Sequence, residues 1–142
     1  MRRILNNDTA FSLLRAGLAL GFTMLMVIIM LRPELQTIAG IPILKIAAHY
    51  HVSLLGHVLT FALMFTLWCW ALIPHFNATS APYIAALVVL TPGTAGEFLQ
   101  SFIPGRYPSG ADFLANVVGV GFAWVMWRLL VLSARQWQRL HV

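Results

Sequence analysis

Residues 53–73 read SLLGHVLTFALMFTLWCWALI, a run of mostly apolar side chains without a single Asp, Glu, Lys or Arg. A helix rises about 1.5 Å per residue, so ~20 residues cross the ~30 Å hydrocarbon core of a bilayer. We therefore expect this stretch to form a transmembrane helix. Similar apolar runs occupy about residues 11–31, 83–99 and 113–132. The sequence thus predicts four transmembrane spans.

The composition of the whole chain supports a membrane location. Of its 142 residues, 60% are hydrophobic and 9% are charged, and the mean hydropathy is +0.82. Soluble domains carry about 25% charged residues, so the charged fraction is far below that of a typical soluble protein. The predicted fold class is all-α: one integral membrane bundle of four transmembrane helices, forming a single domain over residues 1–142.

The third span contains a Pro92-Gly93 pair. Proline has no backbone N–H and disturbs the preceding turn of a helix. Inside a membrane such a break is tolerated where neighbouring helices or water satisfy the freed backbone groups. We therefore predict that the third helix is kinked near Pro92.

The distribution of positive charge predicts the orientation. The terminal segments carry Arg2, Arg3, Arg15, Arg128, Arg135 and Arg139. The first and third loops together carry Arg32, Lys45 and Arg106, and the second loop carries no Lys or Arg. Because cytoplasmic loops and ends are enriched in Lys and Arg, both termini are predicted to be cytoplasmic.

The charges inside the apolar region are concentrated in one place. Between Lys45 and Arg128 the formally charged side chains are Glu97, Arg106 and Asp112. A charge within a bilayer is costly, and such residues usually pair with one another or mark a site. We therefore expect this part of the chain to carry the function.

Helical spacing brings further polar side chains to the same level. Glu97 and Gln100 are three residues apart and share a helix face, as do Asp112 and Asn116, four residues apart. His57 lies near the same outer end of the second span. We predict an outer-facing polar cluster, which consists of His57, Glu97, Gln100, Arg106, Asp112 and Asn116.

The polar cluster has two interpretations. As a ligand site, it would use the guanidinium of Arg106 to bind a phosphate or carboxylate bidentately, oriented by Glu97 and Asp112. As a helix clamp, it would hold the third and fourth spans together, and Asp112 could in addition cap the fourth span. Asn116 fits either role, as an interhelical hydrogen-bonding residue or as a ligand contact, and His57 is either a packed histidine or a site residue.

The sequence leaves enzymatic activity open. His57 and Glu97 are the candidates for a general base, because burial can bring the pKa of a carboxyl toward neutrality. No nucleophile motif or phosphate-binding loop accompanies them. The histidines at 49, 51 and 57 lack paired metal-ligand spacing, so we expect no metal and no cofactor. No basic stripe with interleaved aromatic residues indicates nucleic-acid binding.

Small residues mark places where helices can approach closely. Gly17 and Gly21 form a GxxxG pair in the first span, which makes a homo-oligomer possible. Ala115 and Gly119 form a similar pair in the fourth span, where Gly119 is the predicted packing position. Alternatively, these pairs reflect only the high frequency of glycine and alanine in transmembrane helices.

The segment EFLQSFIPGR at residues 97–106, followed by DFLANVVG at 112–119, resembles the VanZ-like family of small bacterial membrane proteins. That family shows E-x-x-Q, F-x-P-x-R and D-x-x-x-N-x-x-G in this order. The resemblance covers about residues 57–124. His57 resembles the histidine of a D-K-x-x-H pattern in an earlier helix, but Ser53 and Leu54 stand at the Asp and Lys positions, which is a departure.

The resemblance implies a multi-pass protein of the bacterial inner (cytoplasmic) membrane, and the family's namesake is linked to low-level resistance to the glycopeptide teicoplanin. The first hypothesis is that the chain binds, or helps to modify, a cell-envelope lipid or glycopeptide-related ligand at the polar cluster. Its partners would be membrane lipid and a lipid-linked envelope intermediate. The alternative is a non-catalytic accessory or scaffold subunit of a larger membrane complex, in which the cluster is a helix clamp.

Overall fold

The structure, a computed structural model, describes residues 2–31, 50–102 and 109–140. These residues form four α-helices, and no strand occurs among them. The helices are α1 (Arg2–Leu31), α4 (Tyr50–Leu72), α5 (Ala81–Gln100) and α6 (Gly110–Leu140). The all-helical prediction is therefore confirmed for this part of the chain.

Three of the helices are long and apolar enough to cross a membrane. The qualifying stretches are Asp8–Ile29, Leu54–Leu72 and Gly110–Gln138, and the apolar stretch of α5, Ala81–Gly96, is shorter. Large apolar side chains also point outward: Leu13 and Leu87 are each 69% exposed, and Phe122 is 63% exposed. Soluble monomers rarely expose apolar side chains on this scale, whereas a lipid-facing surface requires them.

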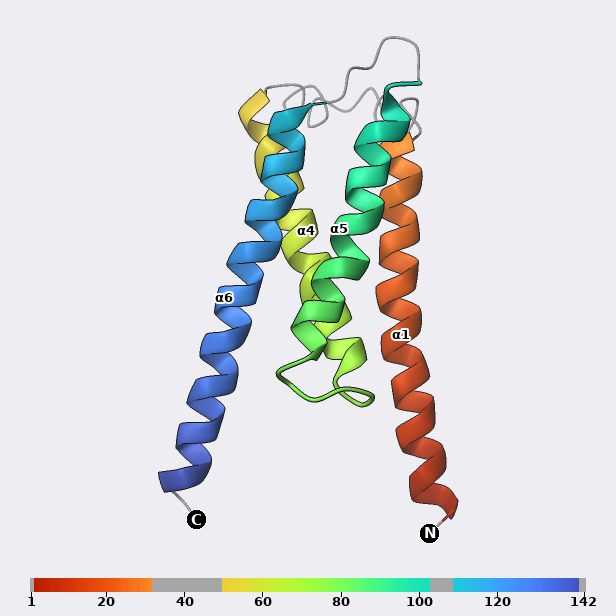
Figure 1. The fold of residues 1–142 in the computed structure, drawn as a ribbon. Helices are drawn as coiled ribbons and strands as arrows, with labels where there is room; N and C mark the ends of the chain where they lie inside the picture. The colour runs from red at the N-terminus through yellow and green to blue at the C-terminus, as the bar shows by residue number, and fades with distance from the viewer. Residues whose placement is uncertain (1, 32–49, 103–108, 141–142) are drawn as a thin grey trace.

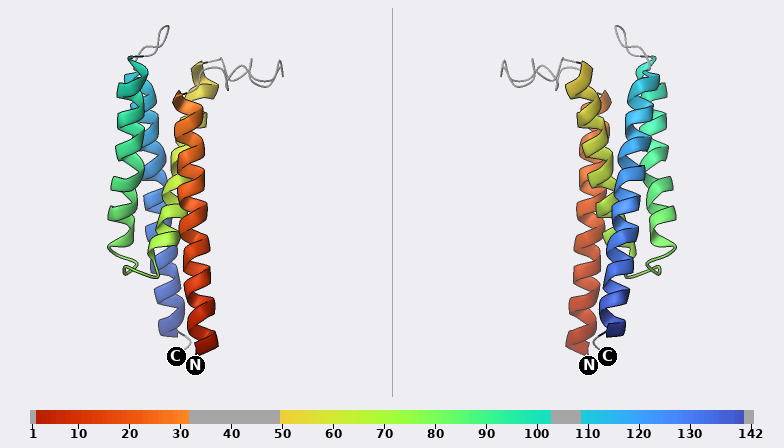
Figure 2. Two further views of the ribbon diagram at one scale, coloured as in Figure 1. Left: turned by 90° about the vertical axis from the view of Figure 1, so that its right-hand side faces the viewer. Right: turned by 90° about the vertical axis from the view of Figure 1, so that its left-hand side faces the viewer.

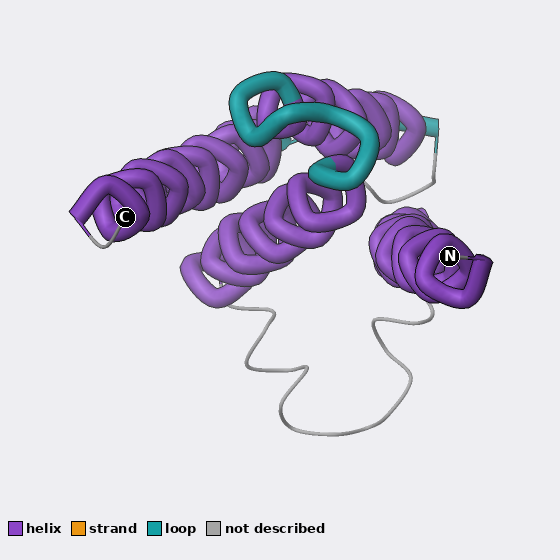
Figure 3. Tube along the Cα trace, turned by 90° about the horizontal axis from the view of Figure 1, so that it is seen from below, coloured by secondary structure: helices purple, strands orange, loops and turns teal. Residues whose placement is uncertain are grey.

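The helices lie alongside one another, with both termini at the same end (Figures 1 and 2). Helix α4 packs most extensively against α6 and also contacts α1 and α5. Viewed from the end that carries the termini, α4 and α5 lie between α1 and α6 (Figure 3). The outer helices α1 and α6 extend beyond the turn between α4 and α5 (Figure 1).

Two helices are longer than the predicted spans. Helix α1 begins at Arg2 rather than near residue 11, and α6 continues to Leu140 rather than ending near residue 132. Hydropathy marks only the part of a helix that is apolar enough for a membrane. Residues 133–140 are rich in Arg and Gln, which favour helix although they are polar, and residues 2–5 contain two Arg and one Leu. The two helices therefore continue into polar sequence.

Helix α5 runs through Pro92 as one element. On either side of the proline, the hydroxyls of Thr91 and Thr94 donate hydrogen bonds to the carbonyls of Leu87 and Leu90, at 2.7 and 2.8 Å. These bonds engage carbonyls in the turn that the proline disturbs. The kink near Pro92 stays a prediction.

The core is built around one face of α4. Aromatic and aliphatic side chains recur there at helical spacing and meet small or branched residues of α5 and α6, because a helix buries residues three or four positions apart. The buried cluster contains Phe61, Met64, Phe65, Cys69, Ala85, Val89, Val120 and Ala123. This packing holds α5 and α6 against α4 and so fixes the polar groups described next.

Candidate functional site: a polar junction of three helices

Two residues of the polar cluster meet directly where α4 crosses α6. His57 Nδ1 lies 2.8 Å from Asn116 Oδ1, and Asn116 is only 1% exposed. An amide oxygen can only accept, so this pairing selects the imidazole tautomer with its proton on Nδ1. The half-buried His57 ring also stacks on Phe61, with centroids 6.5 Å apart. The structure thus joins two residues that are 59 positions apart in the sequence.

Helix α5 supplies the third wall of this junction through Gly93. A Cβ atom added at Gly93 would lie 2.5 Å from the Phe61 ring and 3.6 Å from the Asn116 amide nitrogen. No larger residue fits there without movement of the neighbours, so the backbone of α5 approaches the aromatic ring and the amide closely. Gly93 is therefore a packing position in its own right, because its lack of a side chain lets α4, α5 and α6 meet at one point.

The depth of the junction follows from counting residues along each helix. Asn116 is the seventh residue of α6, His57 the eighth of α4, and Gly93 lies seven residues before the end of α5. At about 1.5 Å per residue, all three lie roughly 10 Å from the helix ends opposite the termini. The junction therefore lies deeper in the bundle than Gln100 and Asp112, which stand closer to those helix ends.

Only one of the two polar atoms of the Asn116 side chain forms a hydrogen bond within the described residues. Its Oδ1 atom meets His57, whereas its buried Nδ2 atom has no hydrogen-bond partner among the described residues. An unpaired buried polar atom costs about 1–3 kcal/mol, and in native structures it usually marks a water, an ion or a ligand group. This amide nitrogen is accordingly the strongest indication of a binding function in the described part of the chain.

One turn below the junction, α6 approaches α4 backbone to backbone. A Cβ atom added at Gly119 would overlap the carbonyl oxygen of Val58 and lie 3.1 Å from its Cα atom. Ala115 and Ala123, one turn away on either side, are buried as well. This close approach of small residues brings Asn116 within hydrogen-bonding distance of His57.

The first turn of α6 is capped by Ser109 rather than by the Asp112 carboxylate. The Ser109 hydroxyl accepts a hydrogen bond from the Asp112 backbone N–H at 3.2 Å. Ser109 and Asp112 stand in the spacing of a capping box, and an acidic residue in the first turn also stabilises the helix dipole. Asp112 is half-buried and lies one turn from Asn116, toward the start of α6.

The remaining members of the polar cluster are only partly described. Glu97 follows Gly93 by four residues, so its backbone occupies the next turn of α5 toward the helix end. Gln100 is the last residue of that helix. The side chains of Glu97 and Gln100, and the whole of Arg106, lie outside the described residues. Their membership in the cluster stays a prediction from the sequence.

The residues predicted from the sequence did not include Phe61, Gly93 as a packing position, or Ser109. Ser109 carried a recognisable signal, because a serine three residues before Asp112 at the start of an apolar run is typical of a helix N-cap. Phe61 follows His57 by one helical turn, but only the tertiary arrangement shows which helix its ring meets. The described residues contain no group of three or more His, Cys, Asp or Glu side chains placed to hold a metal.

Comparisons with protein-family models, with curated proteins and with solved structures find no match to this chain. The VanZ-like resemblance therefore stays a hypothesis that rests on the sequence pattern.

The packing of Gly93 against Phe61 leads to a test by compensation. We expect Gly93→Ala to lower the free energy of unfolding by about 1–2 kcal/mol, because the new methyl group must displace a buried ring. Phe61→Leu should restore part of that loss in the double variant, since the shorter side chain vacates the space. Unfolding by detergent titration would measure both. If the losses in free energy of unfolding of the two single variants simply add in the double variant, the close contact between Gly93 and Phe61 is contradicted.

Proposed function

We propose that this chain is a multi-pass membrane protein that binds a phosphate-bearing, lipid-linked cell-envelope intermediate at the end of the bundle opposite its termini. With both termini cytoplasmic, as the positive charges predict, this end faces the outer side of a bacterial inner membrane. The observation that carries the proposal is the buried, unpaired amide nitrogen of Asn116.

The chemistry of the surrounding residues supports an anionic ligand. Asn116 Nδ2 offers a hydrogen-bond donor, and we expect Arg106, which stands between α5 and α6 in the sequence, to add a guanidinium. A guanidinium binds phosphate bidentately, with contacts stronger than those of neutral donors. Glu97 and Asp112 would orient Arg106 and accept hydrogen bonds from sugar or peptide groups. The resemblance to the VanZ-like family also favours a bacterial inner-membrane location, and its motifs contain Glu97, Arg106 and Asp112.

A second candidate function is that of a non-catalytic scaffold subunit, and a specific observation favours it. The His57–Asn116 hydrogen bond already links α4 to α6 and is partly buried in the bundle. A polar contact of this kind between membrane helices contributes roughly 0.6 to 2 kcal/mol to their association. In this alternative the polar cluster holds the helices together and a partner protein covers the outer surfaces.

Replacing Arg106 with alanine distinguishes the ligand-binding function from the scaffold function. If the cluster binds a phosphate, Arg106→Ala should weaken binding of a polyprenyl phosphate by about tenfold or more, because a charged hydrogen-bond pair contributes about 1.5–3 kcal/mol. Binding would be measured by native mass spectrometry of the purified full-length protein. The unfolding midpoint in detergent should stay within about 2 °C of the wild type.

Arg128→Ala provides the matched control, because Arg128 is an exposed arginine of α6 that lies 18 residues after the start of the helix, far from the polar cluster. Glu97→Gln and Asp112→Asn should also reduce binding while the protein remains folded. Loss of folded protein in these variants would favour the scaffold function. Unchanged binding of polyprenyl phosphate in all three cluster variants would refute the ligand site.

A further inference from the structure

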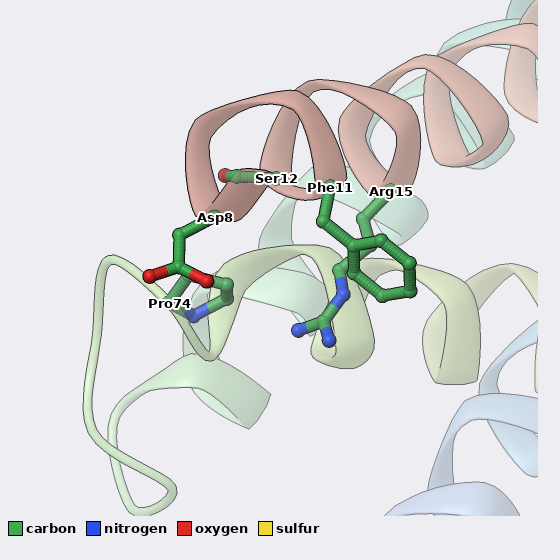
Figure 4. A pocket seen from close by; sticks show the side chains of 5 residues that line it. All are labelled: Asp8, Phe11, Ser12, Arg15 and Pro74. Atoms are coloured by element: carbon green, nitrogen blue, oxygen red, sulfur yellow. The ribbon is translucent and has the colours of Figure 1, made fainter. Parts of the chain in front are cut away.

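A second polar site lies at the opposite end of the molecule, where α1 meets the end of α4. Asp8, Phe11, Ser12, Arg15 and Pro74 line an open hollow of about 370 Å³, the α1–α4 hollow (Figure 4). The residues from α1 recur every three or four positions and so share one face of that helix. The apolar stretches of both helices end here, at Asp8 and Leu72. In a membrane, the hollow would therefore lie at the level of the lipid headgroups.

Arg15 is held by aromatic rings rather than by a carboxylate. Its guanidinium carbon lies 4.9 Å from the ring centroids of both Phe11 and Trp70. Phe11 and Trp70 meet edge to face, with centroids 6.5 Å apart, which fixes the pair around the cation. Cation–π contacts use the faces of the rings and the positive charge, and they leave the N–H groups of the guanidinium available as donors.

The Nε atom of Arg15 is buried, and it has no hydrogen-bond partner in the part of the chain that the structure describes. Within the described residues, neither Arg15 nor Asp8 forms an ion pair, although both line the same hollow. A buried guanidinium donor without a partner calls for an acceptor from outside the chain. Arg side chains suit oxyanions such as phosphate because several donors lie in one plane.

A hydrogen bond next to Pro74 links the two walls of the hollow. The Ser12 hydroxyl and His75 Nε2 are 2.9 Å apart, linking α1 to the turn that follows α4. Pro74 stands in that turn, after the last residue of α4. This bond fixes the position of the hollow relative to both helices, and Ser12 is one of the polar residues that line it.

The two charges in the hollow are opposite in sign. A purely anionic headgroup would satisfy Arg15 but meet the carboxylate of Asp8, whereas a zwitterion satisfies both. We propose that the α1–α4 hollow binds the headgroup of a zwitterionic phospholipid with a primary ammonium, its phosphate on Arg15 and its ammonium on Asp8. Phosphatidylethanolamine has this chemistry. The site is separate from the polar cluster and requires only that the helices stand in a membrane.

Lipid titrations of the purified full-length protein in detergent, followed by native mass spectrometry, test this site. Phosphatidylethanolamine should bind at least tenfold more tightly than phosphatidylcholine, which has no ammonium N–H, or phosphatidylglycerol, which has no cation. Arg15→Gln should abolish the preference, and Arg128→Gln, the matched control, should retain it. Equal binding of the three lipids to the wild type would overturn the proposal.

The Asp8→Asn variant tests the role of Asp8 independently, because Asp8 is exposed and its replacement leaves the Arg15 contacts intact. This variant should bind phosphatidylglycerol more tightly and phosphatidylethanolamine more weakly than the wild type does. An unchanged ranking of the lipids in Asp8→Asn would contradict the role of Asp8. Inorganic phosphate should not displace phosphatidylethanolamine at millimolar concentration; displacement would reassign the hollow to free phosphate and overturn the lipid assignment.

Discussion

Replacing Gly119 with alanine is expected to lower the free energy of unfolding by about 3 kcal/mol, the upper part of the range for overpacked cores. The added methyl group would overlap the Val58 carbonyl oxygen. That atom belongs to the backbone of α4 and cannot rotate away, so α4 and α6 must separate. Separation also lengthens the hydrogen bond between His57 and Asn116. Unfolding by detergent titration, followed by circular dichroism, measures the loss.

Gly121→Ala is the matched control for this experiment. Gly121 lies two residues further along the same helix, and nothing lies within 4 Å of a Cβ atom added there. Alanine has the higher helix propensity, so Gly121→Ala should be neutral or slightly stabilising. If the two variants unfold at the same detergent concentration, the close approach of α4 and α6 at Gly119 is wrong.

The second large effect is expected when His57 is replaced by leucine. Asn116 then keeps both of its buried polar atoms without a partner, which should lower the free energy of unfolding by about 1–3 kcal/mol. Adding Asn116→Leu to this variant should recover part of the loss, because replacing both partners by apolar groups of similar shape removes the unpaired atoms. The same detergent titration measures the recovery.

A double-mutant cycle makes this comparison quantitative. We expect a coupling energy of at least about 0.5 kcal/mol between His57 and Asn116, as for other residues in direct contact. The Ser12–His75 pair offers a comparison at an exposed position, where the coupling should be smaller because water competes for the hydrogen bond. Strictly additive effects of His57→Leu and Asn116→Leu would show that the two side chains do not interact.

The helices and the depth of the site were largely predictable from the sequence. Apolar runs mark the helices because a membrane-crossing segment must be long and uncharged, and counting residues from their ends places His57 and Asn116 at one level. The capping role of Ser109 was likewise available from its spacing to Asp112. These features depend on neighbouring residues in the chain, and local sequence therefore determines them.

The faces that meet between helices were not predictable in the same way. Gly17 and Gly21 have a stronger helix-packing motif than Gly119, yet nothing lies within 4 Å of a Cβ atom added at either of them. Gly119 instead meets Val58, and Gly93 meets Phe61. Such contacts depend on how each helix is rotated against its neighbours. The α1–α4 hollow was missed for the same reason, because Arg15 and Trp70 come together only through the pairing of two helices.

The proposed anionic envelope ligand binds at the end of the bundle opposite the termini, where it would contact the polar cluster. A crystal structure grown in a lipidic mesophase that contains polyprenyl phosphate would show whether it does. We expect non-protein density at the end of the bundle opposite the termini, in contact with Arg106 and continuing by hydrogen bonds to the Asn116 amide nitrogen. Clear density for these side chains, with Asn116 satisfied by the protein itself and no ligand there, would contradict it.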